Sequence, residues 1–333
     1  MRIALDAMGG DRAPECIVEG AVEAVEETSG RLEVVLVGDA RILEEYIEER
    51  GLSGRNIEIE HASEVIGMSE SPATATRRKK DSSIAVATRL HREGSVDAVV
   101  SAGNTGAAVA SSLLAFGRIR GIDRPAIAIF YPSSNGGTIM LDGGATADCL
   151  PRHLTQFAFM GAVFAEMFLQ RKDPVIGLLS IGEEPSKGNE LTREAHRLIA
   201  GSSLNFAGNV EGRDVIAGKV DVVVTDGFTG NVLLKFSESI ISYMTGMIRE
   251  GVERSLKGKI GAGLMKPVFD RMKKTLDYAE YGGMPLLGVD GVTIICHGGS
   301  SAKAIKNAIL AAERFVEIGV NSRIKARAEE AVS

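Results

Sequence analysis

Short apolar runs recur along the chain, and each of them ends in a loop that is rich in glycine. The runs that share this pattern are RIALDAMGGD (2–11), LEVVLVGD (32–39), VDAVVSAGNTG (96–106), TIMLDGGA (138–145), PVIGLLSIG (174–182), VDVVVTDGFTGN (220–231) and VTIICHGGSS (292–301). A run such as VDVVV is apolar on both faces, which is typical of a buried strand in a parallel sheet.

Segments with the helical period of apolar residues separate these strands. They are residues 16–27, 42–49, 154–169 and 302–315, and we expect residues 322–333 to form a frayed helix. The alternation of strand, loop and helix predicts an α/β fold in which a mostly parallel sheet carries helices on both faces. Because loops that follow parallel strands gather at the carboxyl edge of the sheet, we expect most of the glycine loops to meet in one ligand-binding crevice.

Residues 235–276 interrupt this pattern because they contain no strand signal. Residues 240–252 have a helical pattern, and further apolar residues then recur three and four positions apart. These are Leu256, Ile260, Leu264, Met265, Val268, Phe269, Met272 and Leu276. Gly261, Gly263 and Pro267 interrupt the second segment, so we predict two short helices with a bend.

The same stretch is strongly basic. Residues 254–276 hold seven Lys or Arg against one Asp, a local charge of +6 in a chain whose net charge is −6. A basic amphipathic segment favours an anionic membrane surface or an acidic partner. A helical hairpin that packs on a dimer mate, with its lysines in solvent, is the alternative. We assign residues 236–280 to this hairpin, within a single α/β/α catalytic unit of residues 1–333.

Composition and charge narrow the class of protein. The apolar and charged fractions of the 333 residues are those of an ordinary globular protein. A net charge of −6 argues against general nucleic-acid binding, which needs a basic surface. Cys16, Cys149 and Cys296 lack paired or metal-ligand spacing, which fits a reducing cytoplasm. We expect no signal peptide and no membrane span.

The loops after the strands carry the candidate chemistry. Glycine lets backbone N–H groups approach an anion, and the N-terminus of a following helix favours negative charge, so these loops predict a phosphate-bearing ligand. The candidate binding residues are Asp6, Gly9, Gly10, Asn104, Thr105, Gly106, Asp142, Gly143, Asn189, Asp226, Thr229 and Gly230. Asp6 and Asp142 are equally compatible with capping helices. Lys187 stands in a glycine-flanked loop, where a solvated turn lysine is the alternative, and His297 ends a strand beside Gly298.

Several familiar catalytic motifs are absent from the sequence. There is no G-x-G-x-x-G after the first strand, no G-x-x-x-x-G-K-[ST] loop and no G-x-S-x-G nucleophile elbow. The histidines are scattered, and no spacing demands a metal, although aspartates are suitable ligands for Mg²⁺. We therefore expect neither a cofactor nor a metal ion.

Several segments of the chain together resemble one family. They are DAMGGDRAP (6–14), RRKKDSS (77–83), SAGNTGA (101–107), GRIRGIDRPA (117–126), KGNELT (187–192) and VVVTDGFTGNVLLK (222–235). In this order, and across nearly the whole chain, they resemble the bacterial phosphate acyltransferases of phospholipid synthesis, the PlsX family. The connection SSNGGTIM (133–140) is where the chain departs from the family pattern.

The resemblance implies a three-layer α/β/α sandwich related to phosphotransacetylases and to the isocitrate dehydrogenase group. It implies transfer of a long-chain fatty acyl group from acyl carrier protein to inorganic phosphate, which gives acyl phosphate for phospholipid synthesis. It also implies a homodimer that is cytoplasmic and peripherally associated with the inner face of the membrane.

The implied reaction fits the residue types of the loops. A thiolate leaves readily and phosphate is a dianionic nucleophile at neutral pH, so phosphate can attack the thioester directly, without a covalent enzyme intermediate. The enzyme then has to hold phosphate and stabilise the oxyanion. We assign this role to Lys187, an amide donor role to Asn231 and proton transfer to His297.

Two basic regions have candidate partners. Arg77, Arg78, Lys79 and Lys80 form a run that would steer the acidic acyl carrier protein toward the crevice, with a solvated charged face as the alternative. In the hairpin, the residues that we expect against an anionic membrane surface are Leu256, Lys257, Lys259, Ile260, Leu264 and Met265.

Three other functions compete with the acyltransferase. One is a short-chain phosphotransacetylase that uses coenzyme A, which has no need of a basic amphipathic hairpin. A second is a decarboxylating NAD-dependent dehydrogenase, which would need a nucleotide site. The third is a non-catalytic, membrane-bound scaffold of lipid synthesis.

Overall fold

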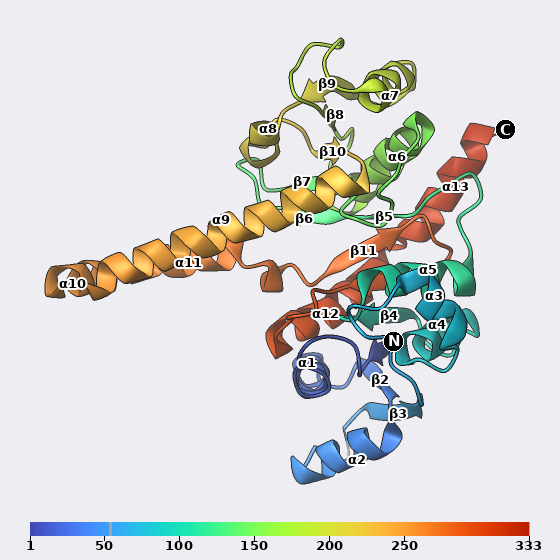
Figure 1. Cartoon of the computed structure of the whole chain (residues 1–333), viewed down its shortest axis with the longest axis vertical. Helices are drawn as coiled ribbons and strands as arrows, with labels where there is room; N and C mark the ends of the chain where they lie inside the picture. Colours follow the sequence, from blue (N-terminus) through green and yellow to red (C-terminus); the bar gives the residue numbers. More distant parts are fainter. Residues whose placement is uncertain (53–54, 333) are drawn as a thin grey trace.

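The computed structural model describes residues 1–52 and 55–332, without the side chains of residues 273, 278 and 330–332. The described strands form two sheets, which Figure 1 shows one above the other along the long axis of the molecule. The larger sheet has the order β3 (Ile57–His61), β2 (Glu33–Gly38), β1 (Arg2–Asp6), β4 (Ala98–Ser101), β12 (Thr293–Ile295), β11 (Met284–Leu287) and β5 (Ala126–Ile127). The smaller sheet has the order β6 (Ile129–Tyr131), β7 (Thr138–Leu141), β10 (Val222–Val224), β8 (Ile176–Leu179) and β9 (Phe206–Val210).

Most neighbouring strands are parallel. Among the described strands, antiparallel pairing occurs where the two sheets meet: β11 is antiparallel to β12 and to β5, and β6 is antiparallel to β7. Only Ala128 separates β5 from β6 along the chain, so one extended segment passes from the larger sheet into the smaller one.

Two apolar clusters cover the opposite faces of the sheets, because alternate side chains of a strand point to opposite sides. In β1, Ile3 and Leu5 belong to one cluster and Ala4 to the other. The first cluster includes α1 (Glu15–Glu27), α2 (Ala40–Glu49), α6 (Pro151–Phe168), α7 (Glu190–Ala200), α12 (Ala302–Ile318) and α13 (Val320–Val332). The second includes α3 (Pro72–Arg78), α4 (Ser83–Arg92), α5 (Thr105–Phe116) and α8 (Gly212–Ala217). The predicted three-layer α/β/α sandwich is confirmed.

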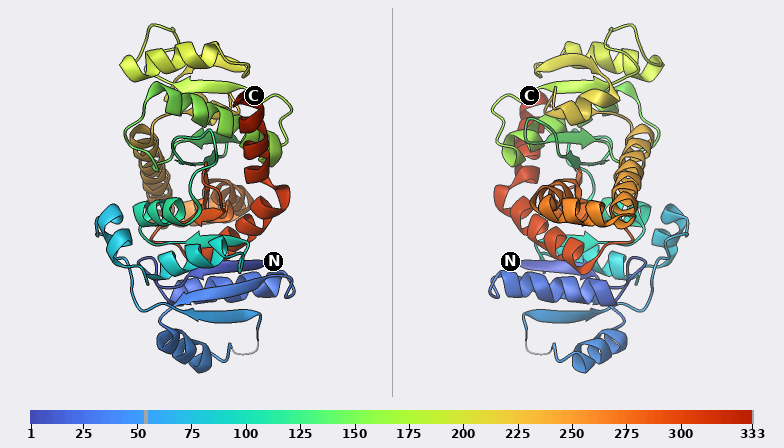
Figure 2. Two further views of the ribbon diagram at one scale, coloured as in Figure 1. Left: turned by 90° about the vertical axis from the view of Figure 1, so that its right-hand side faces the viewer. Right: turned by 90° about the vertical axis from the view of Figure 1, so that its left-hand side faces the viewer.

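A helical hairpin projects from the body of the molecule (Figure 1), and Figure 2 shows this hairpin end-on. Its first arm is α9 (Gly227–Glu253), a helix of 27 residues. The chain then turns through α10 (Leu256–Leu264), and α11 (Lys266–Leu276) leads back toward the body. The predicted bend between two short helices is confirmed at Met265, which caps the end of α10. The short helix η1 (Tyr278–Glu280) connects the hairpin to β11.

The apolar runs correctly predict β1, β2, β4, β7, β8, β10 and β12, but they do not reveal β3, β5, β6, β9 and β11. Three expectations need correction. The glycine loops do not share one sheet edge, because the strands before them are divided between the two sheets. Residues 229–231 form the beginning of α9 and not a loop. The C-terminal segment is a packed helix, in which Ile324 is completely buried.

The N-terminus of α9 packs directly against the loop after β7. A Cβ atom at Gly230 would lie 1.9 Å from the carbonyl oxygen of Asp142, and one at Gly227 would lie 2.5 Å from Asp142 Oδ2. On the other side of the loop, a Cβ at Gly143 would lie 2.4 Å from a side-chain carbon of Ile129. Glycine is therefore required at these positions for the close approach of α9 to the sheet.

Replacement of Gly230 tests this close approach. We expect Gly230→Ala to lower the free energy of unfolding by about 1–3 kcal/mol, because the new methyl group overlaps a backbone oxygen. Gly246→Ala is the matched control on the same helix, since nothing lies within 4 Å of its Cβ position. That variant should gain about 0.5–1 kcal/mol from helix propensity. Urea unfolding followed by circular dichroism measures both, and equal stabilities of the two variants would contradict the packing argument.

Candidate functional site

One buried carboxylate organises the loop after β7. Asp142 is completely buried, and its four hydrogen bonds come from backbone N–H groups. Oδ1 accepts from Ile127 (2.8 Å), Gly144 (3.0 Å) and Ala145 (3.0 Å), and Oδ2 accepts from Thr146 (2.6 Å). Burial raises the pKa of Asp142 to about 6, against the hydrogen bonds, which lower it. Because Ile127 belongs to β5, this carboxylate joins the larger sheet to the loop of the smaller one.

Asn231 lies next to this loop, near the start of α9. The Cβ position of Gly144 is 3.4 Å from Asn231 Cβ and 3.8 Å from its Oδ1. Asp226 caps the helix, because its Oδ1 accepts from the N–H of Thr229 and its Oδ2 from the hydroxyl of Thr229, both at 2.8 Å. Asp226 and Thr229 therefore build the helix N-terminus, whose dipole favours an anion beside Asn231.

The loop after β8 brings Lys187 to the same sheet edge. Strand β10 pairs with both β7 and β8, so the loops after these strands are neighbours. The side chain of Lys187 is exposed, and its Cγ lies 3.0 Å from the Cβ position of Gly182. Asn189 caps α7 by accepting a hydrogen bond from the N–H of Thr192 at 2.9 Å. Asn189 therefore shapes the loop, and Lys187 projects into solvent.

Asp6 ends β1 within tightly packed glycine loops of the larger sheet. Its side chain is buried, and its Oδ2 accepts from the hydroxyl of Ser101 at 2.7 Å. A Cβ at Gly9 would lie 2.4 Å from that oxygen and 2.9 Å from Gly103 Cα, and Gly10 has a φ of +110°. Burial raises the pKa of Asp6, and hydrogen bonds from serine hydroxyls oppose this. These contacts give Asp6 a structural role in holding two loops together.

Asn104 ties a surface loop to the larger sheet. Its Oδ1 accepts an N–H from the first turn of α5, and its Nδ2 lies 3.1–3.3 Å from three carbonyl oxygens in residues 67–70. Helix α5 begins at Thr105, and a Cβ at Gly106 would lie 2.5 Å from Pro72 at the start of α3. The side chain of Asn104 therefore forms hydrogen bonds within the protein, where it stabilises the loop of residues 67–70 and the start of α5.

His297 lies in the loop after β12 and reaches across to α9. Its Nε2 lies 3.0 Å from Oε1 of Glu238, and the two side chains are 31% and 33% exposed. The N–H of Ser300 donates to the carbonyl oxygen of His297 at 3.0 Å, which fixes the loop. Glu238 lies two helical turns beyond Asn231, so α9 connects the loops of both sheets. The sequence analysis missed Glu238, for which the seven-residue spacing from Asn231 was the available signal.

The basic run near residue 80 is divided by the fold. Arg77, Arg78 and Lys80 are exposed, whereas Lys79 Nζ lies 2.6 Å from Glu70 Oε1 and 2.7 Å from the carbonyl oxygen of Val65. Because α3 packs beside the start of α5, the three exposed cations lie near the carboxyl edge of the larger sheet.

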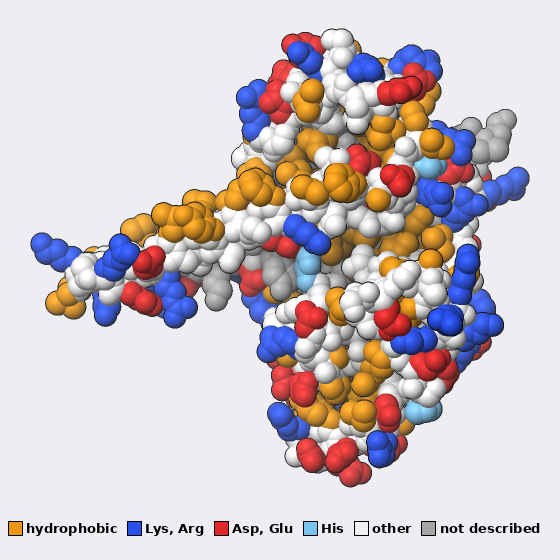
Figure 3. Space-filling view, viewed as in Figure 1, with side chains coloured by type: hydrophobic (Ala, Val, Ile, Leu, Met, Phe, Trp, Pro, Cys, Tyr) orange, Lys and Arg blue, Asp and Glu red, His pale blue; other side chains and the backbone are white. Residues whose placement is uncertain are grey.

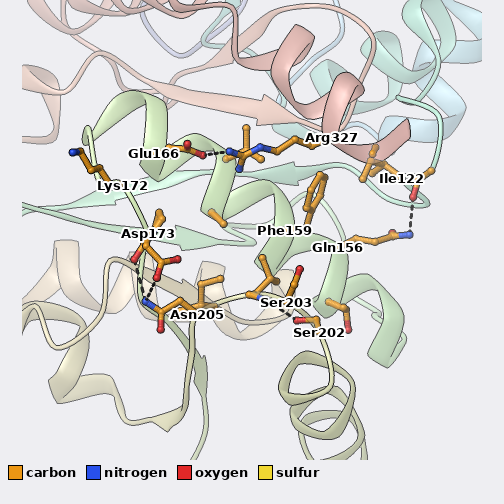
Figure 4. A pocket seen from close by; sticks show the side chains of 18 residues that line it. Ile122, Gln156, Phe159, Glu166, Lys172, Asp173, Ser202, Ser203, Asn205 and Arg327 are labelled. Carbon is orange, nitrogen blue, oxygen red and sulfur yellow. Dashed lines mark hydrogen bonds and ion pairs between the residues drawn. The ribbon is translucent and has the colours of Figure 1, made fainter. Parts of the chain in front are cut away.

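A cavity of 670 Å³, whose lining includes Gly121, Ile122 and Gln156, runs along α6 (Figure 4). Its lining includes residues just before β8 and β9, such as Asp173 and Asn205, and residues of α6 and α13. An ion pair of 2.6 Å between Arg327 and Glu166 lies in its wall. One end of the cavity is therefore at the amino ends of these strands, whereas ligands of open α/β sheets bind at the carboxyl ends.

Figure 3 shows a row of apolar side chains along the projecting hairpin. On α9 the exposed members are Phe228, Val232, Phe236, Ile240, Tyr243, Met244 and Met247, and on α10 they are Leu256, Ile260 and Leu264. A contiguous exposed apolar surface marks an interface. None of the helices in the described part of the chain is long and apolar enough to cross a membrane. Residues 1–52 and 55–332 show no group of three or more His, Cys, Asp or Glu suited to a metal ion.

Similar solved structures define the fold class. A phosphotransacetylase from Streptococcus pyogenes matches with a TM-score of 0.65 and 19% identity, over 95% of this chain and 94% of its own. A branched-chain phosphotransacylase from Enterococcus faecalis V583 matches with a TM-score of 0.58 and 14% identity, over 95% of this chain and 99% of its own. The chain therefore has a phosphotransacetylase-like α/β fold.

Sequence comparison gives the family. The family described as "Fatty acid synthesis protein" matches residues 1–323. A phosphate acyltransferase of Syntrophotalea carbinolica is 52% identical over 98% of this chain and 93% of its own. A phosphate acyltransferase of Heliobacterium modesticaldum is 54% identical over 95% of this chain and 94% of its own. The chain belongs to this family of acyltransferases, and the predicted family membership is confirmed.

The pKa of Asp142 predicts a pH-dependent contribution to stability. Since burial raises this pKa from 3.8 to about 6, protonation favours the folded state, and the contribution is lost as the pH rises through 6. We expect the unfolding free energy of the wild type, relative to Asp142→Asn, to fall by about 2 kcal/mol between pH 4.5 and pH 7.5. Urea unfolding at several pH values measures this difference, and a difference that does not change with pH would refute it.

Proposed function

We propose that this protein is an acyl-ACP:phosphate acyltransferase, which moves a long-chain fatty acyl group from acyl carrier protein to inorganic phosphate. Relatives that are 52% and 54% identical over nearly the whole chain carry the name phosphate acyltransferase, which supports transfer to phosphate. The observation that carries the proposal is the N-terminus of α9, where Asn231 lies against Gly144 at the sheet edge that also bears Lys187. The product, acyl phosphate, serves phospholipid synthesis.

The reaction is a direct attack of phosphate on the thioester. A phosphate oxygen forms a bond to the carbonyl carbon, the C–S bond breaks, and the thiolate leaves with the electron pair. Lys187 neutralises the phosphate and the developing oxyanion, and the amide of Asn231 donates a hydrogen bond to the same region. His297, held against Glu238, passes the proton that the attacking hydrogen phosphate loses to the departing thiolate.

The nearby thiol supports a route without a covalent enzyme intermediate. Burial, together with the charges of Asp142 and Asp226, raises the pKa of Cys149 to about 12. A thiol with such a pKa is a poor nucleophile at neutral pH. Asp6, Asn104, Asp142, Asn189 and Asp226 then act by holding the loops in position, and they do not take part in bond making.

We also propose a cytoplasmic homodimer that associates peripherally with the inner face of the membrane and forms one catalytic unit over residues 1–333. The exposed apolar side chains of α10 and the basic residues around them, such as Lys257 and Lys259, support contact with an anionic lipid surface. The apolar row of α9 supports contact with a second copy. Arg77, Arg78 and Lys80 are exposed cations suited to steering an acidic carrier protein.

Substitution of the two central side chains tests the reaction. With palmitoyl carrier protein and phosphate, we expect Lys187→Ala and Asn231→Ala each to lower kcat/KM for acyl phosphate formation by about 100- to 1000-fold, because each removes an oxyanion donor. Lys172→Ala, which removes an exposed lysine at the amino end of β8, is the control and should keep wild-type activity. If the folded variants keep their kcat/KM, Lys187 and Asn231 have no catalytic role. If the wild type forms no acyl phosphate, the proposed reaction is wrong.

Substitution in α10 tests the membrane contact. We expect wild-type protein to sediment with vesicles of phosphatidylglycerol, and the triple variant Leu256→Ser, Ile260→Ser, Leu264→Ser to lose more than about tenfold in partition. Leu114→Ser is the control for loss of an exposed leucine on the body of the molecule. Light scattering reports the oligomeric state of each variant. Unchanged sedimentation of the triple variant, together with loss of the dimer, would assign α10 to the subunit interface instead.

A further inference from the structure

Residues 117–125, which connect α5 to β5, hold two isoleucines and three arginines. In residues 117–125, Ile119 and Ile122 are buried, with exposed fractions of 1% and 4%. The N–H of Ile119 donates to the carbonyl oxygen of Gly288 at 3.0 Å. The exposed arginines beside these anchors are Arg118, Arg120 and Arg124. The fold thus holds the backbone of this loop while its arginines face solvent.

Arg152, in the first turn of α6, adds a fourth cation to the same surface. Its Nε lies 2.9 Å from Oδ2 of Asp123, and Nη1 of Arg118 donates to the carbonyl oxygen of Asp123 at 2.7 Å. Gln156 fixes the loop from both sides, accepting from the N–H of Asp123 at 2.9 Å and donating to the carbonyl oxygen of Gly121 at 3.0 Å. We call the following residues the arginine cluster: Arg118, Arg120, Arg124 and Arg152. With one carboxylate among four guanidinium groups, it is a basic surface on a protein of net charge −6.

Hydrogen bonds connect the arginine cluster to the N-terminus of α9. Pro125, the neighbour of Arg124, accepts from the hydroxyl of Thr146 at 3.0 Å. The carbonyl oxygen of Thr146 accepts from the N–H of Gly227 at 2.9 Å, at the first residue of α9. A single residue therefore bridges the arginine loop to the helix that carries Asn231.

The electrostatics of the buried His153 and the half-buried Cys149 agree with this placement. Burial lowers the pKa of His153, and the charges of Arg124 and Arg152 lower it further, so both arginines lie near this ring. Burial raises the pKa of Cys149 to about 12, and Asp226 raises it while Arg124 opposes the rise. Arg124 and the capping residue of α9 are thus close enough to act on one thiol.

We propose that the arginine cluster binds the phosphate ester of the pantetheine arm that delivers the acyl thioester. The proposal rests on the proposed function for the thioester substrate. The guanidinium fork matches phosphate oxygens in two parallel hydrogen bonds, and a fixed loop loses little entropy when it binds. An acyl carrier protein and coenzyme A both present this phosphate group, so the cluster recognises chemistry that the two donors share. Arg77, Arg78 and Lys80 are then the cations that contact the acidic protein surface of a carrier.

A binding experiment tests the site without reference to activity. Wild-type protein, Arg124→Ser/Arg152→Ser and a control, Arg92→Ser/Arg197→Ser, are titrated by calorimetry with 4′-phosphopantetheine and with pantetheine. The control removes two exposed arginines that lie on α4 and α7. We expect the wild type and the control to bind the phosphorylated arm at least tenfold more tightly than pantetheine, and the cluster variant to bind both equally. Equal binding of the two arms by the wild type would overturn the proposal.

Kinetics with matched donors identify the source of the phosphate. The palmitoyl thioesters of pantetheine, 4′-phosphopantetheine, coenzyme A and carrier protein are compared for each variant. For the cluster variant we expect kcat/KM to fall by roughly tenfold to a hundredfold with the three phosphate-bearing donors and to stay unchanged with palmitoyl pantetheine. The donor with the highest wild-type kcat/KM shows whether the arm arrives on coenzyme A or on the carrier.

The other possible kinetic results separate failure of the phosphate-binding site from failure of the proposed function. An equal loss with palmitoyl pantetheine would show that the arginines act on the fold or on the reaction, and the proposal would be wrong. A loss confined to the carrier protein would assign the cluster to the acidic surface of the carrier, which also overturns it. If no donor gives acyl phosphate while 4′-phosphopantetheine still binds through the cluster, the proposed function fails and the binding site stands.

Discussion

The buried carboxylate of Asp142 is the contact on which the arrangement of this protein depends. Its four backbone hydrogen bonds join β5 of the larger sheet to the loop after β7 in the smaller one. The same loop accepts the N-terminus of α9, which approaches so closely that Gly227 and Gly230 have no room for a Cβ atom. Burial opposes the ionisation of this carboxylate, and the four backbone hydrogen bonds favour it. The junction therefore depends on every one of these hydrogen bonds.

Helix α9 connects this junction to the larger sheet and to the exposed hairpin. Its first turns place Asn231 against Gly144, and two turns later Glu238 contacts His297 of the larger sheet. The rest of the helix leaves the body and forms the first arm of the exposed hairpin (Figure 1). One continuous helix therefore carries the candidate catalytic residue Asn231, the contact of Glu238 with His297, and an exposed apolar surface suited to binding a partner. The orientation of all three is set by how its N-terminus packs.

The sequence predicts the positions of the loops of the candidate site better than the partners of their side chains. Glycine loops after apolar strands correctly indicate where the candidate loops are, because loops must follow the strands of a parallel sheet. The same reasoning treats Asn104, Asp142 and Asp226 as ligand-binding residues, whereas their side chains accept or donate hydrogen bonds that shape the loops. Glu238 carries no local motif, since its partner is brought to it from the other sheet.

The sequence by itself determined the α/β class, the parallel strands that carry apolar runs, the bend in the basic hairpin and the family of acyltransferases. Hydrophobic periodicity and local motifs carry this information, because each depends on residues that are close along the chain. Only the tertiary structure decided that the strands form two sheets, that residues 229–231 are helical, and that Thr146 links the arginine loop to the start of α9. Those features arise from hydrogen bonds and close packing between distant segments, such as Thr146 with Pro125 and Gly227, which no local pattern specifies.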